Sequence, residues 1–458
     1  MKSEIKSTIE KISTLIQKNE LDQAENLTKK FYNQYKDFDV PYNLMGIISQ
    51  KKNKLDDSIK YFKKAIKKNA NFLSAHINLG IAYQILEKND EAIKSFKNAI
   101  LINENLYEIN NNIGKLYLRI NKPEKAIKYI NRSLELNPNY VDAFFALGKA
   151  YEQLKDIRKA INNYKESIKL KNDYHESYFE LGEIYRNKKN FKMALKYFKN
   201  SNNLKTNIRI LECYLGLNLK KEYELEIKKI IKISSTDRRI ASASSYISQQ
   251  FKIKDKYPFC PNPLDFIYKT NISNHFKNFD IFIKSLLKEI SVQSFVWEPS
   301  KKTTINGYST LGNLSDKNLE NISKLNEIIQ KEMKSYYKSN KDKNVLFIDE
   351  WPKKIKINSW SNRLKKEGYN IAHIHPSGWI SGVFYLQMPF KIRNNEAGIE
   401  FSLHGDNFIK KNRNIPKVQI QPKIGDMILF PSSLFHKTIP FKSNTERVCI
   451  AFDIYRLN

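Results

Sequence analysis

A 34-residue repeat in the first half of the chain limits its possible folds more than any other feature. Glycines recur at this spacing, with no other glycine before Gly216: Gly46, Gly80, Gly114, Gly148 and Gly182. Three further registers, of small residues, tyrosines and mostly aromatic residues, keep the same period: Ala24, Ser58, Ala92, Ala126, Ala160 and Ala194; Tyr83, Tyr117, Tyr151 and Tyr185; Phe62, Phe96, Ile130, Tyr164 and Phe198. Because one such unit cannot bury its apolar face alone, neighbouring units must stack. The pattern predicts an α-solenoid of helical hairpins.

These registers resemble the tetratricopeptide repeat. Counting from residue 5 gives six units, and the first is degenerate because Ile12 stands where the glycine belongs. The small positions should let the two helices of a hairpin approach closely, while the aromatic positions fill the adjacent holes. An imperfect seventh hairpin, 208–233, is expected to cap the stack. The resemblance implies a right-handed superhelix with a concave groove over residues 1–233.

The groove is the expected binding surface of the repeats. The first helices of the units, which face such a groove, carry four asparagines: Asn43, Asn78, Asn111 and Asn112. Their amides could hydrogen-bond a peptide backbone, which makes them candidate contacts for a protein or peptide partner. The chain is rich in asparagine, so composition explains them equally well. Repeats of this kind also serve dimerisation, which leaves a homo-oligomer open.

Charge and hydropathy exclude several other classes of protein. The net charge is +31, but the lysines are spread along helical faces and form no basic stripe, which argues against a nucleic-acid partner. No apolar run approaches the ~20 residues of a membrane span, and the chain begins without a signal-peptide core. The three cysteines are far apart and form no Cys-x-x-Cys pair. We therefore expect a cytoplasmic protein with reduced thiols and no membrane association.

The second half of the chain has a different pattern. Residues 234–255 are rich in serine and charge and are interpreted as a junction. Two helical stretches, 274–292 and 316–338, follow. From residue 353 onwards eight short alternating runs are separated by turn signals, which is typical of a two-sheet antiparallel barrel. The predicted fold is multidomain α + β: the solenoid, and a jelly-roll (double-stranded β-helix) domain with flanking helices at 256–458, its barrel core at 353–458.

Four of the seven histidines lie within residues 373–436. In the segment AHIHP, His373 and His375 stand two residues apart, so a strand would project both imidazoles from one face. His436 begins another short run after GDMILFPSSLF, and Arg447 enters the last run, RVCIAFDIY, eleven residues later. His404, in SLHGDN, is assigned to a turn instead. The other three histidines are candidate metal ligands.

The order of these motifs resembles the iron(II)- and 2-oxoglutarate-dependent oxygenases, and most closely the branch in which H-x-H replaces H-x-D. PFCPNPLDFIY and WEPSKKTTINGYST extend the resemblance over roughly the last 200 residues. It implies that His373 and His436 bind iron(II), with open positions for cosubstrate and O2. His375 either completes a three-histidine set or lies behind the ligands. Arg447 is implied to hold the distal carboxylate of 2-oxoglutarate, with a hydrogen bond from Tyr385. Ascorbate is a further candidate cofactor.

Two functions follow from this combination. The first is a dioxygenase that decarboxylates 2-oxoglutarate to succinate and hydroxylates a protein or peptide recruited by the repeats. The second is a tetratricopeptide interaction scaffold whose barrel is metal-binding or inactive. The absence of a carboxylate at position 375 is the main support for the second function.

Overall fold

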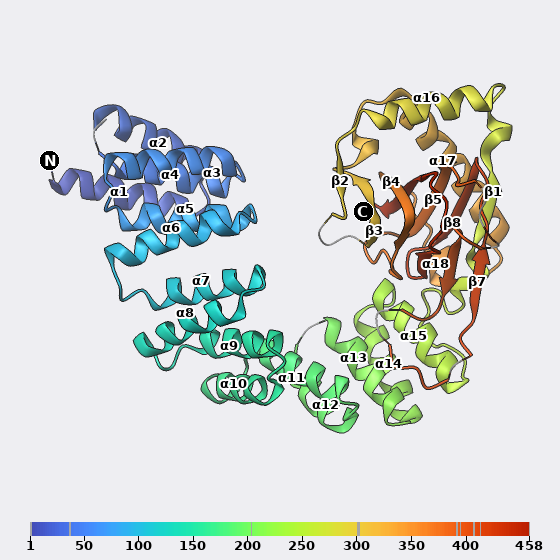
Figure 1. Ribbon diagram of the computed structural model, residues 1–458, viewed down its shortest axis with the longest axis horizontal. Helices are drawn as coiled ribbons and strands as arrows, with labels where there is room; N and C mark the ends of the chain where they lie inside the picture. Colours follow the sequence, from blue (N-terminus) through green and yellow to red (C-terminus); the bar gives the residue numbers. More distant parts are fainter. Residues whose placement is uncertain are drawn as a thin grey trace. The chain divides into compact units, whose positions relative to one another are not determined.

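The computed structural model describes residues 2–35, 38–202, 204–299, 303–390, 393, 395–405, 408–412 and 414–457. The chain divides into two compact units, Met1–Ile184 and Tyr185–Asn458. The first is entirely helical, and the second joins further helices to two β-sheets (Figure 1). None of the helices in the described ranges is long and apolar enough to cross a membrane.

The first unit is a run of antiparallel helical hairpins, as the repeat predicts. Its helices are α1 (Lys2–Gln17), α2 (Leu21–Gln34), α3 (Val40–Lys51), α4 (Leu55–Lys68), α5 (Leu73–Ile85), α6 (Asn89–Ile102), α7 (Tyr107–Arg119), α8 (Pro123–Leu136), α9 (Val141–Gln153) and α10 (Ile157–Leu170). The next helix, α11 (His175–Asn187), contains the boundary with the second unit. The α-solenoid prediction is confirmed.

The glycine and mostly aromatic registers meet inside four successive hairpins. A Cβ atom at Gly80 would lie 2.5 Å from a ring carbon of Phe96, and one at Gly148 would lie 2.3 Å from the ring of Tyr164. Phe96 and Tyr164 are completely buried. Gly46 with Phe62 and Gly114 with Ile130 repeat the arrangement. The close approach of paired helices, expected from the small residues, is therefore confirmed.

This packing predicts that Gly80→Val destabilises the solenoid. The added side chain must displace the buried ring of Phe96, and overpacking a core costs about 1–3 kcal/mol. Lys94→Val, on the exposed face of α6, is the matched control and should change the free energy of unfolding by no more than about 0.5 kcal/mol. Urea unfolding followed by circular dichroism measures both. Equal stabilities of the two variants would contradict the packing argument.

Helices also open the second unit. They are α12 (Phe191–Phe198), α13 (Leu204–Gly216), α14 (Lys220–Ile233) and α15 (Arg238–Phe251). Residues 208–233, the expected capping hairpin, correspond to most of α13 and α14. The expected junction, 234–255, contains α15, and ten of the fourteen residues of this helix are buried. The serine-rich segment thus forms a packed helix, whose N-terminus is capped by Asp237 through the backbone N–H groups of Arg239 and Ile240.

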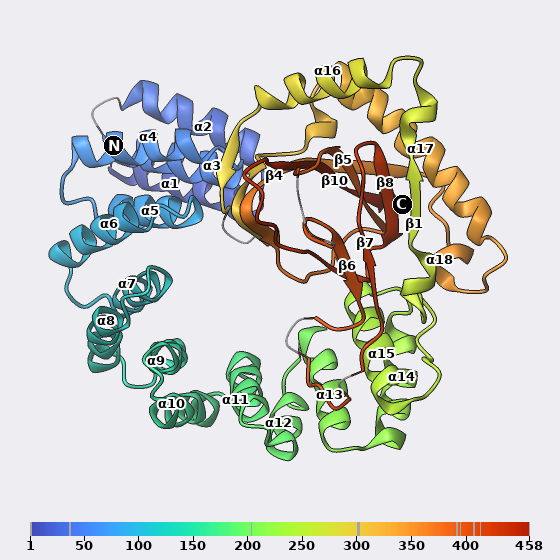
Figure 2. The same cartoon turned by 45° about the vertical axis from the view of Figure 1, so that its right-hand side comes forward.

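The remaining elements form two antiparallel sheets. The elements before the core are η1 (Pro263–Phe266), β1 (Tyr268–Asn271), η2 (Ile272–His275), α16 (Phe279–Ser291), β2 (Phe295–Trp297), β3 (Thr304–Thr310), η3 (Leu314–Asp316), α17 (Glu320–Asn340) and α18 (Leu346–Asp349). The core strands are β4 (Ile355–Asn370), β5 (Ile380–Gln387), β6 (Ile399–Ser402), β7 (Lys417–Ile420), β8 (Asp426–Pro431), β9 (Phe435–Thr438) and β10 (Arg447–Arg456). One sheet has the order β1-β8-β5-β10-β4-β3-β2 and the other β7-β6-β9. Figure 2 shows α16 and α17 outside these sheets, and the predicted fold class is confirmed.

Two local features of the barrel differ from expectation. A strand was expected to carry His373 and His375, but β4 ends at Asn370, and of these two residues His373 pairs through an isolated bridge to His436. The upstream strands β1, β2 and β3 widen the large sheet and were not predicted, since β1 and β2 are only four and three residues long. All three cysteines are buried.

Candidate metal centre

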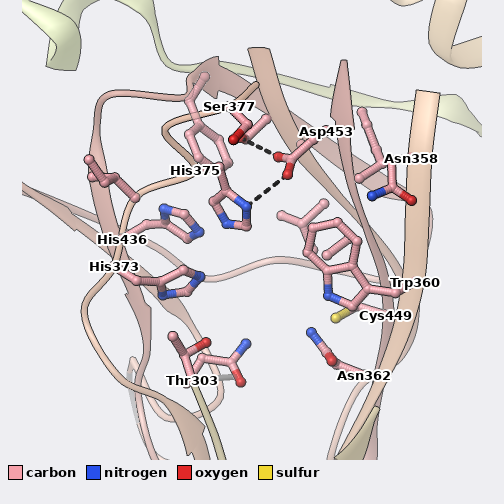
Figure 3. Close-up of a pocket in the computed structure, with 18 of the residues that line it drawn as sticks. Thr303, Asn358, Trp360, Asn362, His373, His375, Ser377, His436, Cys449 and Asp453 are labelled. Carbon is pink, nitrogen blue, oxygen red and sulfur yellow. Dashed lines mark hydrogen bonds and ion pairs between the residues drawn. The ribbon is translucent and has the colours of Figure 1, made fainter. Parts of the chain in front are cut away.

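Three histidines converge on one point inside the barrel. His373 and His436 exchange two backbone hydrogen bonds, each 3.1 Å long, and the His375 N–H donates to the carbonyl of Ser432 at 3.0 Å. These bonds bring together residues more than fifty positions apart in the sequence. One ring nitrogen from each histidine lies within 4.8 Å of the others. Figure 3 shows the three rings facing one another, which is the arrangement that a bound metal ion requires.

The outer nitrogen of each ring is engaged by an oxygen atom. Nδ1 of His373 lies 2.7 Å from the carbonyl oxygen of Ile371, and Nδ1 of His436 lies 3.2 Å from that of Leu434. A carbonyl oxygen can only accept, so both Nδ1 atoms must carry the hydrogen. Each Nε2 then keeps its lone pair free for a metal. Backbone carbonyls are common outer partners of metal-binding histidines.

Burial keeps two of these imidazoles neutral. Loss of solvent lowers the pKa of His373 to about 4, with a smaller contribution from the neighbouring His375. Burial also holds the pKa of His436 well below its usual value. Neutral imidazole is the form that binds a metal, so the rings are in the ligating state at neutral pH.

The third histidine has a carboxylate behind it. Nδ1 of His375 donates to Oδ2 of Asp453 at 2.9 Å (Figure 3). Asp453 is buried, and its second oxygen accepts a 2.7 Å hydrogen bond from Ser381. A carboxylate in this position fixes the tautomer of a metal-binding histidine and increases its basicity. Asp453 was missed in the sequence, although an acidic residue inside the apolar run RVCIAFDIY was a detectable signal.

Arg447 is a buried cation at the start of β10. Only 2% of its surface is exposed. Nε donates to the carbonyl of Ala397 at 2.9 Å, one Nη lies 3.5 Å from Cys449 Sγ, and the Tyr385 ring stacks 4.8 Å from the guanidinium carbon. Within the described part of the chain no carboxylate forms an ion pair with it. An uncompensated buried charge is costly, and a guanidinium has the chemistry to donate hydrogen bonds to an anionic ligand.

A cavity of about 860 Å³ connects the histidines with this guanidinium. Alternate residues of β4 form one wall: Lys356, Asn358, Trp360 and Asn362. The Trp360 ring stacks on His375 at 5.6 Å between centroids. Tyr385 does not line the cavity. Its hydroxyl is buried without a hydrogen-bond partner in the described ranges, and its ring stacks on the guanidinium of Arg447. One ligand can therefore reach the histidines and Arg447 together.

The remaining candidates lie elsewhere. His404 is outside the histidine cluster: its Nε2 contacts the Phe408 carbonyl at 3.0 Å and its ring packs on Tyr246. Among the groove asparagines, Asn43 and Asn111 are buried, while Asn78 and Asn112 are half-buried. Asn78 donates to Asn43 at 3.0 Å, which links two successive units. Neither amide atom of Asn111 has a hydrogen-bond partner among the residues that the structure describes.

Comparison with known protein families identifies both halves of the chain. Tetratricopeptide-repeat models match residues 71–139 and also 41–72, 141–174 and 175–208. A model described as "Putative 2OG-Fe(II) oxygenase" matches residues 358–453. The chain carries tetratricopeptide repeats followed by a domain of this oxygenase family. The oxygenase match includes the three clustered histidines, Arg447 and Asp453.

Several solved structures also match part of the chain. The chain is 28% identical to MamA over 34% of its own length and 91% of that chain, with a TM-score of 0.32. It is 20% identical to YrrB, titled "a TPR protein with an unusual peptide-binding site", over 42% of its own length and 97% of that chain, with a TM-score of 0.35. It is 14% identical to Pseudomonas aeruginosa pilF over 43% of its own length and 91% of that chain, with a TM-score of 0.37. A search of curated proteins found no match.

Proposed function

We propose that the oxygenase domain is an iron(II)- and 2-oxoglutarate-dependent dioxygenase that hydroxylates a protein or peptide recruited by the repeats. The observation that carries the proposal is the joint placement, around one cavity, of three histidines and a buried arginine that forms no ion pair with a carboxylate of the described residues. An open three-ligand site beside a carboxylate-binding group is what this chemistry needs.

The donor set fits iron(II). His373, His375 and His436 would hold the ion through Nε2, since their Nδ1 atoms are occupied. Replacement of the usual carboxylate by His375 leaves the set of direct ligands without a negative charge. The carboxylate of Asp453, which is hydrogen-bonded to His375, supplies a negative charge next to this set of ligands. This pairing weakens the main argument for an inactive barrel.

The remaining cavity residues have assignable roles. Iron(II), when bound, would supply the reduction of O2 that drives oxidative decarboxylation. Arg447 would hold the distal carboxylate of 2-oxoglutarate, because the planar guanidinium can donate two parallel hydrogen bonds to it. The Tyr385 ring keeps the guanidinium in place from behind. Trp360 and the polar positions of β4 would face the substrate.

This proposal predicts that the full-length protein, loaded anaerobically with iron(II), converts 2-oxoglutarate to succinate when exposed to air. Even without its substrate, an oxygenase of this kind should turn over 2-oxoglutarate slowly, so succinate should exceed the amount formed by the His436→Ala variant. Mass spectrometry measures the succinate. Equal amounts from the two proteins, with the histidine centre occupied by iron in the wild type, would favour the scaffold function.

A further inference from the structure

We propose that Arg238, on helix α15, is a positioning residue that holds His375 in its metal-binding orientation, so that the helices before the barrel are part of the metal centre. The inference rests on the proposed function for the identity of the metal, but its geometry is independent of it. Arg238 lies 137 positions before His375 in the sequence, and no sequence motif links the two.

The guanidinium of Arg238 clamps the turn that follows the H-x-H segment. Nε donates to the carbonyl of Pro376 at 3.0 Å, and one Nη lies 3.4 Å from that of Ser377. The other Nη donates to Thr236 within its own segment at 2.8 Å. The guanidinium carbon also lies 6.0 Å from the Phe259 ring centre and 5.8 Å from that of Trp379. Donors and stacking surfaces together define one orientation for the arginine.

The turn that Arg238 clamps is continuous with the metal ligand. The Gly378 N–H donates to the His375 carbonyl at 3.0 Å, which closes the turn 375–378. Gly378 also packs so tightly on Ser432 that a Cβ atom would come within 2.7 Å of its hydroxyl. Pro376 and Ser377 line the cavity beside His375. Release of their carbonyls would therefore remove one of the restraints on this turn, beside the bonds that His375 makes to Ser432 and Asp453.

The same helix holds a second part of the barrel, the loop between β6 and β7. Tyr246 donates to the Ile409 carbonyl at 2.7 Å, and Gln250 accepts from the backbone N–H groups of Lys411 and Asn412 at 3.0 and 2.6 Å. Glu212 of α13, a buried carboxylate, accepts from the Ile409 N–H at 3.2 Å. Helices α13 and α15 are thus attached to the barrel at two separate places. A displacement of α15 would reach the metal centre through Arg238.

The test compares variants of the full-length protein with Co(II) as the metal probe, because its visible absorption reports ligand geometry without turnover. Arg238→Ala should bind Co(II) about 10–100-fold more weakly, the usual effect of losing an outer partner of a metal site, and should shift the absorption bands. Arg238→Lys should recover part of the affinity, because an ammonium group can donate to one carbonyl but cannot stack as a plane. Arg239→Ala, an exposed neighbour with the same charge change, should match the wild type.

The outcomes separate this inference from the proposed function. A folded Arg238→Ala protein with wild-type Co(II) affinity and spectrum would overturn the positioning role, whether or not the iron form makes succinate. If Arg238→Ala does not fold, an unchanged affinity and spectrum in Arg238→Lys would overturn it equally. A weakened, spectrally shifted variant beside a wild type that forms no succinate would support the positioning role and reject the dioxygenase.

Discussion

His436→Ala is expected to abolish iron(II) binding, and His373→Ala and His375→Ala should have the same effect. The three rings present Nε2 atoms to one point, since each Nδ1 is engaged with an oxygen. Loss of one of three ligands should lower the affinity by more than the roughly 10–100-fold that an outer partner contributes. Anaerobic equilibrium dialysis with iron(II) measures the affinity of each variant.

Two further variants distinguish the loss of a metal ligand from the loss of an outer partner and from the loss of an unrelated histidine. Asp453→Asn keeps the shape of the side chain that contacts His375 but removes its charge, so it should weaken binding within the roughly 10–100-fold range. His404→Ala removes a histidine of the same domain that lies outside the cluster and should leave binding unchanged. Unaltered iron affinity in His375→Ala would show that the third position is not filled by this histidine.

The features that the sequence predicted are those carried by periodic or short-range patterns. The glycine and aromatic registers repeat, so their contact inside each hairpin, such as Gly80 with Phe96, could be inferred without coordinates. His373 and His375 are two residues apart, so an extended segment was expected to project both from one face, although the structure has an isolated bridge at His373 in place of a strand. Association of these residues with His436 and Arg447 came from the resemblance to a family, because no local rule connects such distant positions.

The features that were missed are contacts between residues far apart in the sequence and backbone conformations that the residue type does not indicate. Asp453 lies 78 positions from the histidine that it orients, and Arg238 contacts a turn 138 positions away. One residue in the turn between the two helices of a hairpin has a positive φ, and this position also recurs every 34 residues. It is occupied by asparagine, glutamate or lysine instead of glycine, as at Asn53 (59°), Glu87 (59°) and Lys155 (61°). Since glutamate and lysine seldom adopt this conformation, residue type gave no indication of it, and only the 34-residue spacing could have done so.

Arg447→Ala is expected to remove most of the affinity for 2-oxoglutarate while leaving iron binding intact. Truncating one partner of a buried, hydrogen-bonded charge pair costs about 2–5 kcal/mol, which corresponds to roughly 30- to several-thousand-fold in affinity. The cost should fall in this range because Arg447 is almost fully buried and no carboxylate pairs with it among the residues that the structure describes. Titration of the iron-loaded protein with 2-oxoglutarate, followed by the metal-to-ligand absorption band, measures the effect.

Two further variants decide whether the guanidinium itself is responsible. Arg447→Lys should recover only part of the affinity, because an ammonium group lacks the planar pair of donors that matches a carboxylate. Arg456→Ala removes the same charge from the other end of β10, where the side chain pairs with Glu350 at 2.7 Å, outside the cavity. The midpoint of the 2-oxoglutarate titration of Arg456→Ala should equal that of the wild type. If Arg447→Ala also kept the wild-type midpoint, the buried guanidinium would be a structural support for Tyr385 and Ala397, and the distal carboxylate would bind elsewhere in the cavity.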